Sequence, residues 1–244
     1  MSPLEYVRVR PGVLAALDYP GTPAPGSGVL HGDRFWLGRD LDRLDDRTMV
    51  LAVGANAAPA VLAAKLRRAG VAGVVGMVRA EVAGLGVGHS AHVSRRGYIP
   101  AGPYAAEGAA AVVGLWLTAE QLAAIDATEP NYDRMMLRRA EYSLRLETGR
   151  PPSTYDVYVS RWGVLATDGV PLRLGTQREL FARLAGDPGL AALAPWDDAE
   201  AAVRGLADRA AHARIRDAFA AAGWVADATL GSADEAVDPL DGQP

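Results

Sequence analysis

The chain has 244 residues, half of them hydrophobic, which is enough for a substantial core and suits one large domain or a domain with an extension. A net charge of −4 argues against a nucleic-acid-binding face, which needs a basic patch. The absence of cysteine excludes disulfides, thiolate zinc sites and a cysteine nucleophile. No apolar run reaches the ~20 residues of a membrane helix and no signal peptide is recognisable, so we expect a cytoplasmic protein without a membrane partner.

The N-terminal segment is expected to carry little regular structure. A short strand is predicted over residues 4–10, and a stretch rich in Pro, Gly and charge then runs to residue 46. Such punctuation is typical of turns and loops. We therefore expect residues 1–46 to form an arm draped over the domain.

Residues 47–160 are expected to form the core. Pro59 at a first helical position and Gly70 just past the end predict a helix over residues 59–69. Residues 85–108 are rich in Gly and Pro and are expected to form a long irregular excursion. Short apolar runs predict strands at residues 48–53, 74–78, 112–117, 135–146 and 154–160. This order of elements favours an α+β fold.

A second helix of the core has clear boundaries. Thr118 and Gln121 form a capping box at its start. Its end is expected by about Glu129, because the residue before Pro130 is biased out of the α region.

Residues 161–231 are expected to form a hairpin followed by a helical extension. Asp168-Gly169 predicts the turn of the hairpin, and Pro171 would confine its second strand to a sheet edge. Thr176 and Glu179 form another capping box, and residues 198–222 have a helical pattern. The acidic tail at residues 232–244 is expected to be disordered.

Glu129 is the first candidate for chemistry. A carboxylate at a helix C-terminus faces the negative end of the macrodipole, so we expect its pKa to be raised. A raised pKa suits a residue that takes a proton and returns it. Tyr132, three residues further on, could orient Glu129 or a substrate group.

Val53-Gly54-Ala55-Asn56 is the second candidate. It joins a strand to a helix, where backbone N–H groups point outward and can bind a carboxylate. Gly54 allows close approach of a ligand to the backbone, and Asn56 can bind through its side chain.

Together these segments resemble the gamma-glutamylcyclotransferase-like family, which carries a Tyr-Gly-Ser-Asn loop after its first core strand and Asp-x-x-Glu at a helix end, followed by Tyr and Arg. The counterparts here are the loop from Val53 to Asn56 and the run from Asp126 to Glu129 with Tyr132 and Arg134. The resemblance covers roughly residues 48–146. It implies a mixed sheet curled into a small barrel with flanking helices, and the C-terminal helices are an extension of it.

The resemblance also implies an activity. A γ-glutamyl-amine or related amide would cyclise to 5-oxoproline with release of an amine. Glu129 would be the general acid/base, and the Gly54-Ala55-Asn56 loop would hold the substrate carboxylate. Neither a metal nor a cofactor is required for this reaction.

Departures from the family pattern keep an alternative open. Val53 replaces the family's Tyr, so a hydroxyl is lost, and Ala55 replaces Ser. The alternative is a non-catalytic protein of the same fold that binds a small anionic metabolite or a protein partner. The oligomeric state is left open.

The excursion at residues 85–108 holds further candidates. His89, Ser90 and Tyr98 are candidates for lining a cavity opposite Glu129. His89 and His92 could pass for a metal pair, but without a third ligand nearby we assign no metal site.

Overall fold

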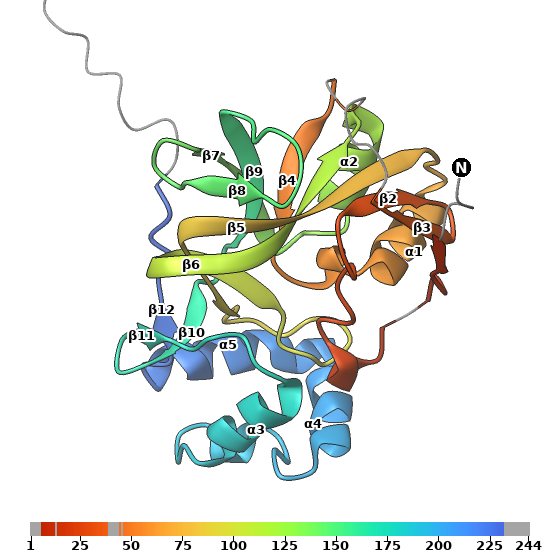
Figure 1. The fold of residues 1–244 in the computed structure, drawn as a ribbon. Coiled ribbons are helices and arrows are strands. Elements are labelled where there is room, and N and C mark those ends of the chain that lie inside the picture. Colours follow the sequence, from red (N-terminus) through yellow and green to blue (C-terminus); the bar gives the residue numbers. More distant parts are fainter. Residues whose placement is uncertain (1–5, 13, 39–43, 45, 232–244) are drawn as a thin grey trace, which may run out of the picture.

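The computed structural model describes residues 6–12, 14–38, 44 and 46–231, and it confirms an α+β protein with a large mixed sheet (Figure 1). In these residues nine strands form one sheet in the order β1-β3-β2-β5-β6-β4-β9-β7, and β8 pairs with β5. The strands are β1 (Tyr6–Arg8), β2 (Gly28–His31), β3 (Arg34–Leu37), β4 (Thr48–Ala52), β5 (Val74–His89), β6 (Ala101–Leu117), β7 (Tyr132–Arg138), β8 (Leu144–Leu146) and β9 (Thr154–Ser160).

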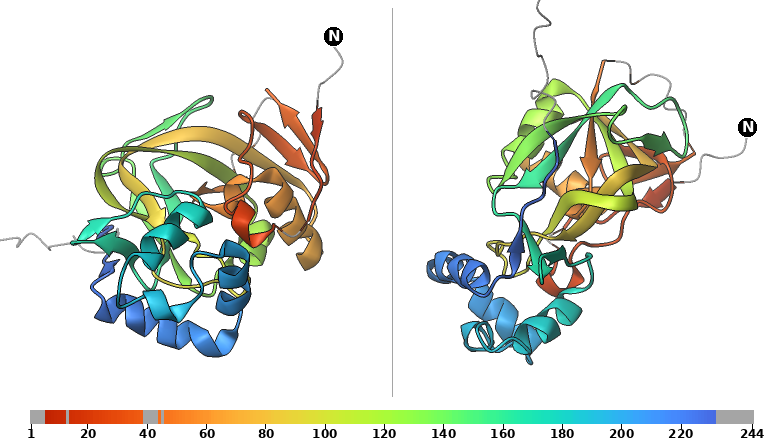
Figure 2. Two further views of the ribbon diagram at one scale, coloured as in Figure 1. Left: turned by 90° about the horizontal axis from the view of Figure 1, so that it is seen from below. Right: turned by 90° about the vertical axis from the view of Figure 1, so that its left-hand side faces the viewer.

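The sheet does not close into the small barrel that we expected. Closure would require β7, at one edge, to pair with β1 at the other. Among the described residues β7 pairs only with β9, and β1 pairs only with β3. Figure 2 shows the sheet as strongly curled but open, so the family-specific barrel remains an expectation.

The expected N-terminal arm is in part a piece of this sheet. The prediction of loops up to residue 46 was wrong for β2 and β3, because β2 pairs with both β3 and β5. A buried Phe35 anchors β3 in the core. The segment between β1 and β2 contains a short 3-10 helix, η1 (Ala16–Asp18).

The irregular excursion expected at residues 85–108 was also wrong in part. β5 continues to His89 and β6 begins at Ala101, so the two strands form a long antiparallel hairpin. A register shift between Ala83 and Leu85 bends the hairpin at Gly84, which has a φ of 81°. Only residues 90–100 at its tip are irregular.

The helices of the core match their predicted boundaries. Helix α1 (Pro59–Ala69) has Pro at its start and a left-handed Gly70 at its end. Helix α2 (Ala119–Asp126) begins with the Thr118–Gln121 capping box, in which both reciprocal hydrogen bonds form. The two helices contact each other at one end of the sheet (Figure 1).

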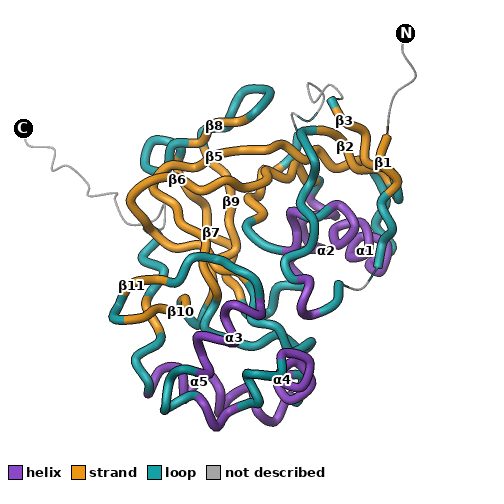
Figure 3. Tube along the Cα trace, turned by 60° about the horizontal axis from the view of Figure 1, so that its bottom comes forward, coloured by secondary structure: helices purple, strands orange, loops and turns teal. Residues whose placement is uncertain are grey.

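The C-terminal part is a separate layer of helices below the sheet (Figure 3). The predicted hairpin forms from β10 (Val164–Thr167) and β11 (Val170–Pro171), with β11 at the edge of a small sheet completed by β12 (Val225–Ala226). The helical run expected over residues 198–222 is interrupted near Asp208, a cap of the 3-10 helix η4 (Arg209–Ala211). The helices are α3 (Gln177–Ala185), α4 (Ala199–Leu206) and α5 (His212–Ala221).

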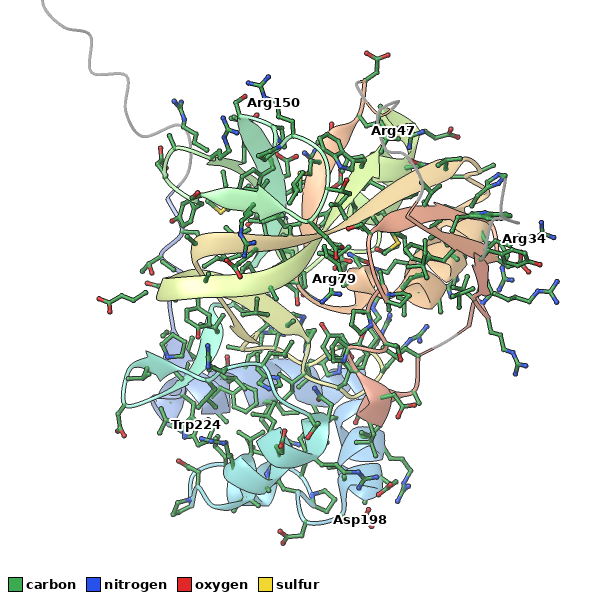
Figure 4. The ribbon with its side chains drawn as sticks, in the orientation of Figure 1. Arg34, Arg47, Arg79, Arg150, Asp198 and Trp224 are labelled. Atoms are coloured by element: carbon green, nitrogen blue, oxygen red, sulfur yellow. The ribbon has the colours of Figure 1, made fainter. Side chains whose placement is uncertain are left out.

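This layer has its own hydrophobic core, which includes Phe181, Leu206 and Phe219. Trp224 and Asp198, both labelled in Figure 4, stabilise it at two points. Trp224 donates its indole N–H to Asp187 over 2.7 Å, and Asp198 caps α4. None of the helices in the described part is long and apolar enough to cross a membrane. The tail at residues 232–244 lies outside the described residues.

Candidate functional site

The two segments singled out in the sequence lie against each other. Asn56 belongs to the 3-10 helix η2 (Ala55–Ala57) after β4, and Glu129 follows α2 in a turn closed by its own N–H to Asp126. The Asn56 side-chain amide donates to Glu129 Oε1 over 3.0 Å. The Glu129 side chain is only 15% exposed. The fold therefore brings the Glu129 carboxylate into contact with the loop from Val53 to Asn56.

Lys65 is a member of this group that sequence reasoning missed. Its Nζ lies 2.6 Å from Glu129 Oε1, and both side chains are largely buried. The ammonium and the carboxylate form an ion pair at the edge of the loop. One signal was present in the sequence, because Lys65 is the only lysine among 25 Lys and Arg residues.

The Asn56 side chain also offers an unused acceptor. Its Oδ1 is buried and has no donor among the described residues. Rotating the amide by 180° would place this oxygen against the Glu129 carboxylate, where two acceptors would repel each other. The orientation in which the amide nitrogen donates to Glu129 is therefore the favourable one. A buried acceptor without a partner costs about 1–3 kcal/mol. A ligand N–H beside Glu129 would satisfy it.

Tyr19 brings a hydroxyl to the loop from the N-terminal segment. Its oxygen accepts the Ala101 N–H over 2.7 Å, and the N–H of Ala55 faces the same oxygen. A Cβ on Gly54 would lie 2.4 Å from this oxygen, so a residue without a side chain is required there. This hydroxyl comes from a residue distant in sequence, and no local pattern pointed to it.

Three more tyrosines complete the surroundings of Glu129. Tyr98 stacks on Tyr19 with a centroid separation of 4.4 Å, and the Tyr132 hydroxyl donates to the Ala101 carbonyl over 2.7 Å. Tyr158 donates to Asp126 over 2.6 Å. Burial raises the pKa of each tyrosine, and the nearby Glu129 charge raises it further. All four therefore stay protonated near neutral pH.

Asp126 and Arg134, charged residues on either side of Glu129 in the sequence, have a structural role. Arg134 on β7 donates to Asp126 over 3.0 Å and also pairs with the buried Asp156 of β9. These contacts connect the end of α2 to the sheet. They fix the turn that carries Glu129.

The remaining candidates lie on either side of this group. Ser90 Oγ is 2.6 Å from His92 Nδ1 and 2.6 Å from Ser160 Oγ, and Ser90 also contacts the Tyr132 hydroxyl. Tyr98 and Ser90 thus lie beside the tyrosines that surround Glu129. His89 instead accepts the N–H of Gly175 and lines a separate cavity of about 690 Å³ beside α3.

The two histidines make separate hydrogen bonds, His92 with Ser90 and His89 with Gly175. Burial lowers the pKa of His92 to about 3 and that of His89 to about 4, so both are neutral near pH 7. Across the described residues, no group of three or more His, Cys, Asp or Glu side chains converges on one point.

A cavity of about 920 Å³ adjoins the loop, and Glu129 is not among its lining residues. Val53 and Gly54 line it together with residues 20–25 of the N-terminal segment. Its wall on the sheet includes Arg79, which is labelled in Figure 4. The loop therefore contributes to this cavity as well as to the group around Glu129.

Comparisons with protein-family models, with curated proteins and with solved structures gave no match. The chemistry of the site is therefore argued from its residues. A carboxylate, an ammonium, an amide and several neutral hydroxyls can bind a polar small molecule and transfer a proton.

Proposed function

We propose that the protein is a cyclotransferase that converts a γ-glutamyl-amine or a related amide into 5-oxoproline and a free amine. Glu129 is the general acid/base. The loop from Val53 to Asn56, together with Tyr132, forms the substrate site.

The proposed reaction needs one proton acceptor and one donor. Glu129 takes a proton from the substrate α-ammonium, and the freed nitrogen attacks the side-chain carbonyl carbon. A new C–N bond closes the five-membered ring, and Glu129 returns the first proton to the leaving nitrogen. The second proton of the ring nitrogen follows the same route through Glu129 as the bond to the leaving amine breaks. The products are then the neutral lactam and an ammonium, and Glu129 ends as a carboxylate. An intramolecular attack has a high effective molarity, so positioning and one proton shuttle suffice.

The hydrogen bond between Asn56 and Glu129 carries the proposal, because it joins the loop to the acid across the fold. Two further observations support it. The free Asn56 Oδ1 is suited to accept an N–H of the substrate ammonium. Lys65 lies 2.6 Å from Glu129 Oε1, so the site pairs the proposed proton acceptor with a fixed positive charge.

The test is an assay of 5-oxoproline release from γ-glutamylalanine. Glu129→Gln keeps the size of the side chain but cannot shuttle a proton, so we expect a loss of at least ~100-fold in kcat. Glu120→Gln, an identical change at an exposed position of α2, is the control and should be neutral. Equal activity in the wild type and Glu129→Gln would remove Glu129 from the mechanism.

A second candidate is a protein that binds a small anionic metabolite or a protein partner without catalysis. The observation in its favour is that the 920 Å³ cavity is lined by Val53 and Gly54 but not by Glu129. The same assay separates the two candidates. A wild-type protein that releases no 5-oxoproline yet shows saturable binding of 5-oxoproline in calorimetry would favour this candidate.

A further inference from the structure

The hydroxyl of Tyr19 is held in an unusual way. Its oxygen accepts the Ala101 N–H, and the Ala55 N–H faces it from the loop. The Ala101 hydrogen bond uses one acceptor position of the oxygen and the Ala55 N–H lies beside it, so the phenolic proton must point elsewhere. Among the described residues no acceptor receives it, and the Glu129 carboxylate is one of the groups whose charge acts on Tyr19.

The segment that carries Tyr19 is fixed by the C-terminal helices. The 3-10 helix η1 contacts both α3 and α4, and Leu17 packs against the hydrophobic core of that layer. Figures 1 and 2 show this turn between the sheet and the helices. Tyr19 itself is only 6% exposed. Tyr19 is therefore a buried and fixed part of the site.

The same helices fix Tyr98, on which Tyr19 stacks. Gly97 approaches α4 so closely that a Cβ would lie 2.0 Å from the Val203 carbonyl. The buried Gln177 side chain, at the start of α3, accepts the Ile99 N–H over 2.8 Å and donates to the Ile99 carbonyl over 2.9 Å. Both neighbours of Tyr98 are thus held by the helical layer.

We propose that Tyr19 is a second catalytic residue, whose O–H donates a hydrogen bond to the carbonyl oxygen of the substrate amide as that oxygen gains negative charge. This inference rests on the proposed function. Tyr19 keeps its proton throughout, so the proton balance through Glu129 is unchanged. A fixed donor aimed at a developing oxyanion lowers the barrier without strengthening ground-state binding. The C-terminal helices thereby acquire a role, because they hold this donor in place.

The test compares kcat and KM of the full chain with γ-glutamylalanine. Tyr19→Phe keeps the ring that stacks on Tyr98 and removes the hydroxyl, and we expect kcat to fall ~100-fold with KM within about threefold of wild type. Tyr6→Phe, at an exposed tyrosine on β1, should leave both constants unchanged. Replacing Tyr19 by 3-fluorotyrosine keeps the hydroxyl and alters its acidity, so it should change kcat as well.

The outcomes separate the two proposals. A wild type that releases no 5-oxoproline overturns both of them. Activity that is lost in Glu129→Gln but kept within threefold in Tyr19→Phe overturns only the role of Tyr19. If Tyr19→Phe does not fold, the fluorotyrosine protein decides, and an unchanged kcat there overturns the inference.

Discussion

Asn56 and Glu129 are joined by a hydrogen bond of 3.0 Å, although 73 residues separate them in the sequence. Each stands in a turn next to a helix, Asn56 before α1 and Glu129 after α2. The contact between α1 and α2 sets the distance between the turns. The site is therefore sensitive to changes at Asn56 that leave the rest of the fold untouched.

Asn56→Asp should destabilise the protein in a pH-dependent way. The change removes the donor to Glu129 and places a second carboxylate beside it, at a cost of about 1–3 kcal/mol when both are ionised. Protonation of one carboxylate relieves the repulsion, so the loss should be larger at pH 8 than at pH 5 in urea unfolding. Asn131→Asp is the control, since Asp can still accept the Trp162 indole N–H. An equal loss of unfolding free energy at both pH values would show that residue 56 does not lie beside the Glu129 carboxylate.

Lys65 should react slowly with acylating reagents. It is the only lysine, so the α-amino group is the one other primary amine in the chain. Because its ammonium is held by Glu129 and is largely buried, we expect acetylation by an N-hydroxysuccinimide ester to be ~10-fold slower than in Glu129→Gln, a factor worth about 1.4 kcal/mol. Peptide mass spectrometry over time gives both rates. Identical rates in the two proteins would show that the ion pair does not protect the amine.

Gly54→Ala should displace Tyr19. The added Cβ would lie 2.4 Å from the Tyr19 hydroxyl and 3.1 Å from Ala101 Cβ, and overpacking of this kind costs about 1–3 kcal/mol. Gly205→Ala is a control that should change the stability in the opposite direction. Gly205 lies inside α4 with open space where the Cβ would be, so this change should stabilise the protein by about 0.5–1 kcal/mol. Thermal unfolding of both variants checks the prediction, and a neutral Gly54→Ala would refute the close approach.

The elements that were predicted correctly are those specified by neighbouring residues. Thr118 with Gln121 and Thr176 with Glu179 form capping boxes, and Asp168-Gly169 adopts the positive φ angles of a tight hairpin turn. The errors occurred where pairing is long-range. β5 and β6 are rich in Gly and Ala, which give no alternating pattern, and their strands form because they pair with each other along most of their length.

The same distinction applies to the site. Glu129 and the loop at Gly54 carried local signals, namely a helix end and a strand-to-helix turn. Tyr19 is placed by the packing of η1 on distant helices, and the loop sequence around it gives no hint of that contact. Lys65 had only its rarity as a signal, because its partner is brought near by the packing of α1 against α2.

The buried histidines should make the protein less stable in acid. In the unfolded chain a histidine takes up a proton near pH 6.5, whereas in the folded protein burial lowers the pKa of His92 to about 3 and of His89 to about 4. The full stability is therefore present above pH 6.5 and is lost as the pH falls toward the folded pKa values. Between pH 6.5 and 5 each histidine should account for a loss of about 2 kcal/mol.

Urea unfolding at pH 7.5 and pH 5 checks this expectation with matched variants. His92→Gln can still accept a hydrogen bond from Ser90 through its side-chain carbonyl, but it does not titrate. The difference in unfolding free energy between the two pH values should therefore shrink by about 2 kcal/mol in this variant. His31→Gln, at an exposed histidine, should leave the difference unchanged. An unaltered pH dependence in His92→Gln would mean that His92 is not held neutral by burial.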